Sequence, residues 1–402
     1  MRAKFGGLEA ELASWTELSR AGGPLEKHHT QVAAIVAAMA VPIAELRPRL
    51  DDPGTWAQTE RLLIRVHAVL EYFRSKLMLR FVPAFRDYLA MADQYAWECY
   101  LPARQRATVP REPPLTFFSP DTTPFAIPRG ASYRGELSVL TEGSLRAVVE
   151  RLPVPVIGIP WFQLKHLPDA MVLAHEVGHH VEIDFRLTPT LERLVSAAVP
   201  VERAQVWRRW LGEVFADVYG ALAGGTAFCG ALADFVATGP ATTDGAYPPP
   251  AIRVALVTEA LRASGLPGHP PDDRLPVTGP YGQDAGPVAA ALVAGPYPEF
   301  GDVPLTHVID FAPQQDVADR TAERLLRGHM LPATTVRTLL AAAAIAFARD
   351  PLRYERGDVA DVVVKAALAT ITAGIRATPK AVHGGERDQA AGRAILDLLA
   401  VR

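Results

Sequence analysis

Two histidines and a glutamate in one short stretch are the residues of this sequence best suited to chemistry. They stand in Ala174-His-Glu-Val-Gly-His-His180. On a helix, His175 and His179 are one turn apart on the same face, so both imidazoles can bind a single metal ion. Glu176 projects about 100° round the helix, beside such an ion rather than onto it. Zinc lowers the pKa of its bound water to about 7, and the Glu176 carboxylate can then take the proton.

A site of this kind needs a third protein ligand, because catalytic zinc usually takes three and keeps one position open. The pattern with a histidine shortly downstream fails, since Glu182 and Phe185 occupy the places where it needs glycine and histidine. Glu213 and Asp217, however, are again one turn apart in a predicted helix. We expect Glu213 to be the third ligand. We expect Asp217 to accept a hydrogen bond from the outer nitrogen of a ligating histidine, which fixes its tautomer.

The neighbours of these residues on the first helix have competing interpretations. Gly178 leaves room for another backbone to approach this face. Glu182 is seven residues past His175, near its face, and is an alternative ligand, as is Asp184. His180 is interpreted as a surface group or a partner of Asp184 rather than as a substrate contact.

The motif His-Glu-x-x-His followed by Glu-x-x-Ala-Asp resembles that of the gluzincin zinc metallopeptidases. It is most similar to the branch of the heat-shock membrane peptidases, the prenyl-protein processing peptidases and their small soluble relatives. The resemblance covers about residues 150–255, roughly a quarter of the chain. It implies a zinc-dependent peptidase, of the endopeptidase kind, with one Zn²⁺ per chain. His175, His179 and Glu213 would be the ligands and Glu176 the general base.

A second motif of that branch is only partly present. His-Pro-x-x-x-x-Arg often follows the third ligand, and this chain has Tyr247-Pro-Pro-Pro-Ala-Ile-Arg253. The resemblance implies that Arg253 lies near the substrate or braces the site. Tyr247 replaces the histidine that donates to the transition state, and a phenol can also hydrogen-bond a developing oxyanion. His307 and His329 are alternative donors.

The segment Val154-Pro-Val-Ile-Gly-Ile159 predicts a strand just before the metal-binding helix. Its prolines lack the N–H that an inner strand donates, which favours a place at the edge of a sheet. An edge at Val156, Ile157 and Gly158 matches what the related folds use to hold an extended peptide. We therefore expect a protein or peptide substrate to add there as a strand.

The expected fold class is α+β and mostly helical, with a zincin-like core that has a small sheet and an active-site helix. We expect an N-terminal helical region at 1–109, the core at 110–264, a Pro/Gly-rich loop or linker at 265–304 and a C-terminal helical region at 305–402. Residues 110–135 are expected to be irregular, and Asp169 to cap the helix that carries His175. Predicted helices cover about 62–77, 85–100, 144–152, 169–185, 201–222, 251–263, 316–327, 334–349, 359–375 and 386–401, and a predicted strand covers 136–140.

Charge and composition exclude several classes of function. With 41 basic and 44 acidic residues, the formal net charge is −3, which gives no long-range attraction to nucleic acid or anionic membrane. Cys99 and Cys229 are too few for a disulfide framework and are interpreted as reduced core thiols. The apolar windows Val32–Ala44 and Leu339–Ala348 are shorter than the roughly 18–20 residues of a bilayer span, and no signal peptide is visible. We expect a cytoplasmic protein without a membrane span.

Two other functions remain open from the residues alone. One is a regulatory or interaction protein that keeps a zincin-like scaffold and binds a protein partner through its terminal helical regions. The other is metal-dependent hydrolysis of a non-peptide amide, which the same site chemistry permits. The pair His28-His29 has no metal-binding pattern and is assigned no role.

Overall fold

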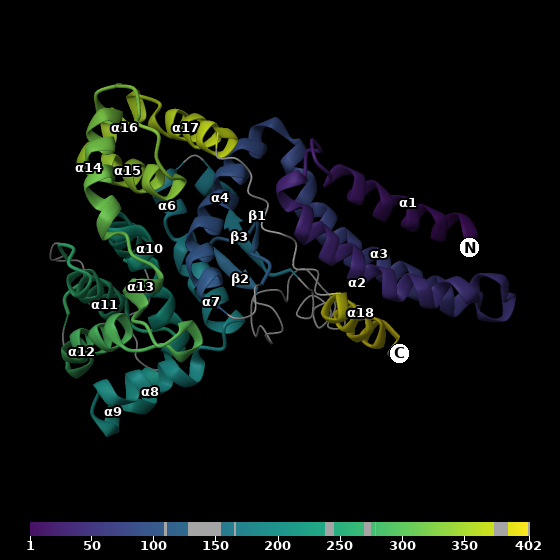
Figure 1. Cartoon of the computed structure of the whole chain (residues 1–402), viewed down its shortest axis with the longest axis horizontal. Helices are drawn as coiled ribbons and strands as arrows, with labels where there is room; N and C mark the ends of the chain where they lie inside the picture. Colours follow the sequence, from purple (N-terminus) through teal and green to yellow (C-terminus); the bar gives the residue numbers. More distant parts are fainter. Residues whose placement is uncertain are drawn as a thin grey trace.

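The chain is mostly helical with one small sheet, in agreement with the expected α+β class (Figure 1). The computed structural model describes residues 1–107, 111–127, 154–164, 166–237, 245–268, 275–277, 279–373 and 385–400. The predicted strand at 136–140 and the predicted helix at 144–152 lie outside these residues. The longer helices are α1 (Arg2–Leu18), α2 (His29–Leu46), α3 (Trp56–Met78), α4 (Pro83–Arg106), α7 (Leu173–Asp184), α8 (Thr188–Ala198), α9 (Val201–Arg209), α10 (Leu211–Val236), α11 (Pro250–Ala263), α12 (Pro280–Ala294), α14 (Ala312–Leu326), α15 (Val336–Arg349), α17 (Val359–Ala373) and α18 (Gly385–Ala400), and the short ones are α6 (Leu167–Ala170), α13 (Leu305–Val308) and α16 (Pro351–Arg356).

The sheet of the described residues has three strands in the order β1-β3-β2. Strand β3 pairs in parallel with β1 and antiparallel with β2. Thus β1 and β2 both lie within residues 110–135, which were wrongly expected to be irregular. The strands are β1 (Leu115–Ser119), β2 (Phe125–Ile127) and β3 (Val156–Pro160).

Strand β3 is the middle strand, which overturns its prediction as a substrate-binding edge. Val156, Ile157 and Gly158 have a paired residue on both sides. The prolines do not interfere, because Pro155 precedes the strand and its carbonyl accepts a hydrogen bond from the Leu115 N–H at 2.9 Å. No free edge therefore remains at these three residues for an added peptide strand.

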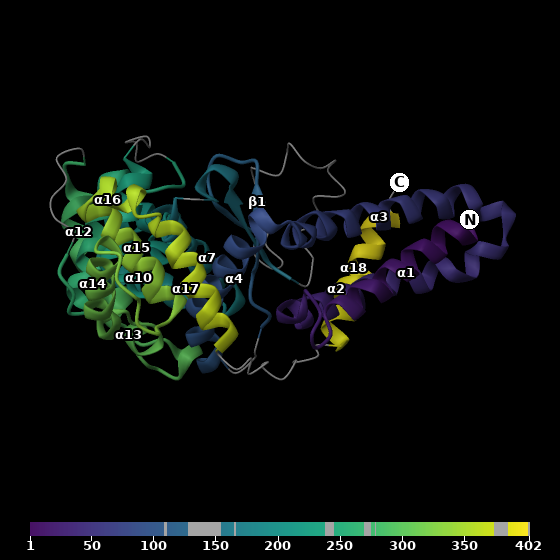
Figure 2. The same cartoon turned by 90° about the horizontal axis from the view of Figure 1, so that it is seen from above.

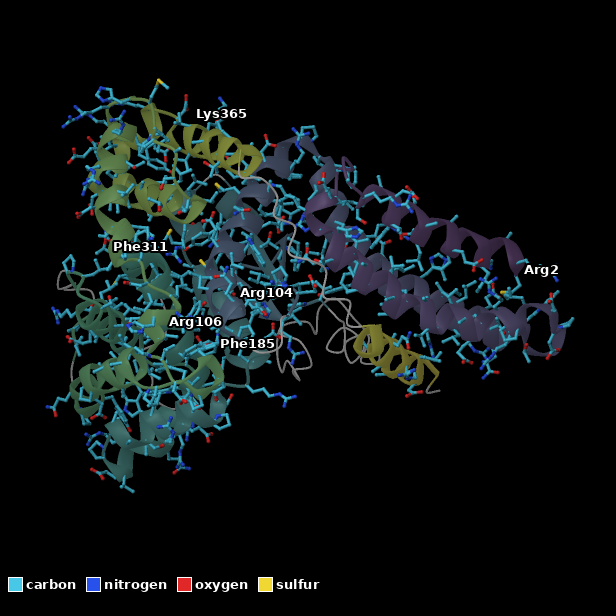
Figure 3. The ribbon with its side chains drawn as sticks, viewed as in Figure 1. Arg2, Arg104, Arg106, Phe185, Phe311 and Lys365 are labelled. Atoms are coloured by element: carbon cyan, nitrogen blue, oxygen red, sulfur yellow. The ribbon has the colours of Figure 1, made fainter. Side chains whose placement is uncertain are left out.

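The helices are divided between a body and an arm (Figures 1 and 2). The arm comprises α1, α2, α3 and α18, and the body contains α4 and helices α6 to α17. Figure 2 shows α18 crossing the arm beside α2 and α3, so the two ends of the described chain lie on the same part of the molecule. In Figure 3 the arm residue Arg2 lies far from Phe185 and Phe311 of the body.

Each part has its own apolar core. The arm core contains Trp15, Ile35 and Val66, together with strand residues such as Phe117. The body core contains the buried face of α4 and most of α7, α10 and α15. Because the sheet contributes side chains to both cores, it lies between them and joins the arm to the body.

A buried ion pair strengthens this junction. Arg80, between α3 and α4, donates to both oxygens of Asp93 in α4 at 2.9 and 2.8 Å. It also donates to the Thr116 carbonyl of β1 at 2.8 Å and to Nε2 of His28 at 3.0 Å. Burial would raise the pKa of Asp93, but Arg80 and His28 hold it well below its usual range. His28, which the sequence left without a role, thus belongs to a structural network.

Two predicted helix boundaries near the metal motif are wrong. The expected helix at 169–185 is divided into α6 and α7. Asp169 does not cap α7, because its carboxylate pairs with Nδ1 of His166 at 3.0 Å. The expected helix at 201–222 is divided at Trp210 into α9 and α10, and α10 continues to Val236 across a kink at Gly225. Gly225 has a φ of 61°, which only glycine adopts readily.

The stretch 265–304 is not a structureless loop, because it contains α12. Pro280 stands in the first turn, where a missing N–H costs nothing. Val288 and Leu292 are buried in the body core. The apolar spacing of this segment therefore outweighs its high content of proline and glycine.

Two helical stretches of the described residues are long and apolar enough to cross a membrane. Glu26–Asp51 has half of its apolar window buried in the protein, and Leu211–Val236 has 83% buried. The first includes the predicted window Val32–Ala44. That window alone is shorter than a bilayer span, but the helix together with its flanking turns is long enough. The second is a core helix of the body that carries Glu213 and Asp217.

Candidate metal centre

Helices α7 and α10 cross in close contact at a glycine. A β-carbon placed on Gly178 would lie 2.7 Å from the α-carbon of Ala216, closer than side chains approach in proteins. This close approach agrees with the expectation that Gly178 leaves room for another backbone. Because Ala216 lies between Glu213 and Asp217 in α10, the contact brings the acidic pair of α10 beside the histidine pair of α7.

Helix α4 holds both ends of α7 through tyrosine hydroxyls. Tyr95 donates to the carbonyl of Met171, just before α7, at 3.3 Å. Tyr100 donates to the carboxylate of Asp184, the last residue of α7, at 2.6 Å. Tyr219 of α10 donates to the carbonyl of Cys99 in α4 at 2.7 Å. These bonds could not be predicted from sequence patterns, because Tyr100 and Asp184 are 84 residues apart.

Three predicted ligands come together in this arrangement. Nε2 of His175 lies 3.1 Å from Nε2 of His179 and 3.3 Å from Oε2 of Glu213. Nε2 of His179 lies 3.5 Å from Oε1 of Glu213. Among the described residues, this is the group of three acidic, imidazole or thiol side chains whose ligand atoms lie close enough, within 4.8 Å, to hold one metal ion.

The distances between the three ligand atoms fit those expected around a zinc ion. Ligand atoms about 2.0–2.2 Å from a tetrahedral ion are about 3.3–3.6 Å from one another. The observed 3.1, 3.3 and 3.5 Å are close to that range. The side chains of His179 and Glu213 are 20% and 16% exposed, whereas that of His175 is 6% exposed. His179 and Glu213 are therefore partly exposed to solvent, whereas His175 is buried.

Asp217 and Arg253 fix the orientation of His175. Oδ1 of Asp217 lies 2.8 Å from Nδ1 of His175, as the sequence analysis expected. Arg253 donates to both oxygens of Asp217 at 2.7 Å. Its Nη2 also lies 3.5 Å from Oε2 of Glu213. With Nδ1 directed at a carboxylate, the ring turns Nε2 towards His179 and Glu213.

The charges of the group are strongly coupled. Burial lowers the pKa of His175, but Asp217 and Glu213 outweigh it and raise the value to about 10. Burial lowers the pKa of His179 to about 4. Burial would raise the pKa of Glu213, but the two histidines and Arg253 hold that pKa well below its usual range. His179 and Glu213 are thus in the forms that bind a metal, neutral imidazole and carboxylate.

The remaining predicted residues differ in their surroundings. Glu176 is buried on α7, and its charge helps to raise the pKa of Arg253. Tyr247, just before α11, is 56% exposed. His307 and His329 are exposed and are not part of the ligand group. Arg253 contacts both Asp217 and Glu213, and its two expected roles stay predictions, as does the oxyanion donor.

His180, Glu182 and Asp184, the residues of α7 with competing interpretations, are all buried. Glu182 and Asp184 are both buried and are outside the ligand group. Thr188 donates to Oε1 of Glu182 at 3.0 Å. His180 is fully buried, so its interpretation as a surface residue is wrong. Its other interpretation, as a partner of Asp184, stays a prediction.

Comparison of the chain with protein-family models, with curated proteins and with solved structures gave no match. Any assignment of function therefore depends on the motif and on the geometry of the group.

Proposed function

We propose that this chain is a zinc-dependent peptidase of the gluzincin type, with a zincin-like core around α7 and α10. One observation carries the proposal: two imidazole Nε2 atoms and the Glu213 carboxylate lie within 4.8 Å of one another. The hydrogen bond that Nδ1 of His175 donates to Asp217 supports it, because ligating histidines usually have such a partner. His175, His179 and Glu213 would hold one Zn²⁺ per chain.

A bound zinc ion would supply Lewis acidity, which polarises a carbonyl and makes water more acidic. Glu176 would accept the proton of the attacking water at its carboxylate. It would then return that proton to the leaving amine nitrogen, so the same side chain serves as base and acid. Its burial supports this role, because a carboxylate shielded from bulk water keeps the proton it receives for the second step.

Two further residues would support the reaction. Arg253 would keep Asp217 ionised and in place, so that the imidazole of His175 remains correctly turned. Tyr247 would donate its hydroxyl to the developing oxyanion. The position of Tyr247 in the chain supports this assignment. It lies just before α11, and Arg253 of α11 contacts Glu213 in the ligand group.

The test compares cells that express the parent chain, Glu176→Gln or Glu192→Gln, the last an exposed glutamate on α8. New peptide termini are identified by mass spectrometry, and zinc is measured in each purified protein. We expect all three to hold zinc, but Glu176→Gln to lose at least about a hundredfold in cleavage. Equal cleavage by Glu176→Gln and the parent would refute the proposed role. Absence of cleavage by the zinc-loaded parent would favour an interaction scaffold or an amide substrate other than a peptide.

A further inference from the structure

The outer nitrogen of His179 is the starting point. Its Nε2 faces His175 and Glu213 at 3.1 and 3.5 Å. If Nε2 binds a metal, the single N–H of the neutral ring must be on Nδ1. Ligating histidines almost always donate that N–H to a carboxylate, a carbonyl or a water. His175 has Asp217 for this purpose, and His179 requires a corresponding group.

Glu182 lies on the correct side of His179, one turn further along α7. Its side chain is buried, and the hydroxyl of Thr188 holds Oε1 at 3.0 Å. The other oxygen, Oε2, lies 3.3 Å from the position that a β-carbon would have on Gly212. Nδ1 of His179 lies 3.9 Å from the same position. The carboxylate oxygen and the ring nitrogen therefore border one small space, at the point where Gly212 has no side chain.

The backbone does not explain a glycine at this position. Gly212 is in the first turn of α10 and is not among the described glycines with positive φ. Alanine would favour the helix by up to about 1 kcal/mol. A methyl group there would, however, occupy the space between Glu182 and His179. The space between Glu182 and His179 therefore explains a glycine at position 212.

We propose that Glu182 positions His179 by accepting the Nδ1–H through one bridging water in the space over Gly212. It is the counterpart of Asp217, which contacts His175 directly. A water can join a donor and an acceptor that are too far apart for a direct bond at little cost in free energy. A carboxylate at the outer nitrogen fixes the ring and makes Nε2 a better ligand. This inference rests on the proposed zinc site.

The experiment measures zinc affinity of the full chain by competition with a chromophoric chelator. The variants are Glu182→Leu, Glu182→Gln and Gly212→Ala. Tyr100→Phe is the control, because it removes a buried hydrogen bond to α7 at Asp184. Thermal unfolding of each metal-free protein reports its structural integrity. The visible spectrum of the Co²⁺-loaded protein reports the geometry of the ligands.

We expect Glu182→Leu and Gly212→Ala to weaken zinc binding about 10- to 100-fold and to alter the Co²⁺ spectrum. Glu182→Gln keeps an acceptor oxygen but loses the charge, so its zinc affinity should lie between those of Glu182→Leu and the parent. Gly212→Ala should unfold at the parent temperature or above, which separates positioning from folding. Tyr100→Phe should lower the unfolding temperature and leave zinc affinity unchanged.

Two results would overturn the inference. If Glu182→Leu and Gly212→Ala bind zinc as the parent does, Glu182 does not position His179, and the proposed zinc site stands. If the parent itself binds no zinc, the proposed function fails and the role of Glu182 fails with it. The parent measurement therefore distinguishes the two failures.

Discussion

Asp217 accepts hydrogen bonds from His175 and Arg253 on the same carboxylate, with Oδ1 2.8 Å from Nδ1 of the histidine. The carboxylate is fully buried. Burial would raise its pKa, but Arg253 and His175 lower it, so the group stays ionised. A buried charge of this kind persists because it is paired on every side, and its partners are therefore held in one geometry.

Asp217→Asn should weaken zinc binding about 10- to 100-fold, because an amide is a poorer acceptor for the Nδ1–H of His175. The matched control is Asp284→Asn. Asp284 also accepts two bonds from an arginine, Arg203, at 2.7 Å, and is outside the ligand group. Zinc titration of both variants checks the prediction. It is contradicted if both variants keep the affinity of the parent, or if both lose it equally.

Gly178→Ala should lower the free energy of unfolding by about 1–3 kcal/mol, because the new methyl overlaps the backbone of α10 at Ala216. It should also weaken zinc binding, since α7 and α10 must move apart. Gly6→Ala is the control: Gly6 lies in the exposed face of α1 with nothing within 4 Å of the added carbon. That change should stabilise the protein by up to about 1 kcal/mol. Urea unfolding of both variants measures the difference, and equal effects would rule out the overlap.

The meeting of α7 and α10 could be predicted from sequence because it depends on local rules. The spacing of His175 and His179, and of Glu213 and Asp217, puts each pair on one helical face. Gly178 indicated a close approach, and the structure has one. These inferences need only the geometry of a single helix and the number of ligands that zinc takes.

Features set by distant parts of the chain could not be predicted. Pro155 favoured an edge strand, but it lies just outside β3 and its carbonyl still pairs with Leu115. The central position of β3 depends on β1 and β2. Both strands are short and lie in a segment rich in proline and glycine, so their sequences do not indicate strands. The network of Arg80, Asp93 and His28 likewise joins residues far apart in sequence. No periodic pattern records such contacts.

Lys76 predicts a pH dependence of stability. Its amine lies 3.6 Å above the ring of Tyr72 and 4.4 Å from that of Phe117, and burial lowers its pKa to about 7. The unfolded value is about 10.4, so between the two the unfolded chain binds more protons. The free energy of unfolding should therefore rise with pH from about 7 to about 10, by up to about 1.4 kcal/mol per pH unit from this residue.

Lys76→Met should remove that contribution. The variant should gain most stability at pH 7, and the gain should shrink towards pH 10. Urea unfolding at several pH values measures this, with Lys365→Met as an exposed control on α17 (Figure 3). A Lys76→Met variant whose stability runs parallel to that of the parent would show that Lys76 is charged in the folded protein at pH 7.

The central claim is that two imidazoles and the Glu213 carboxylate share one ion. The most direct test is elemental analysis of the protein purified without chelator, beside the double variant His175→Ala/His179→Ala and Glu213→Gln. We predict one zinc per chain in the parent, none in the double variant, and greatly reduced zinc in Glu213→Gln. A parent protein that contains no zinc and takes up none from solution would contradict the account.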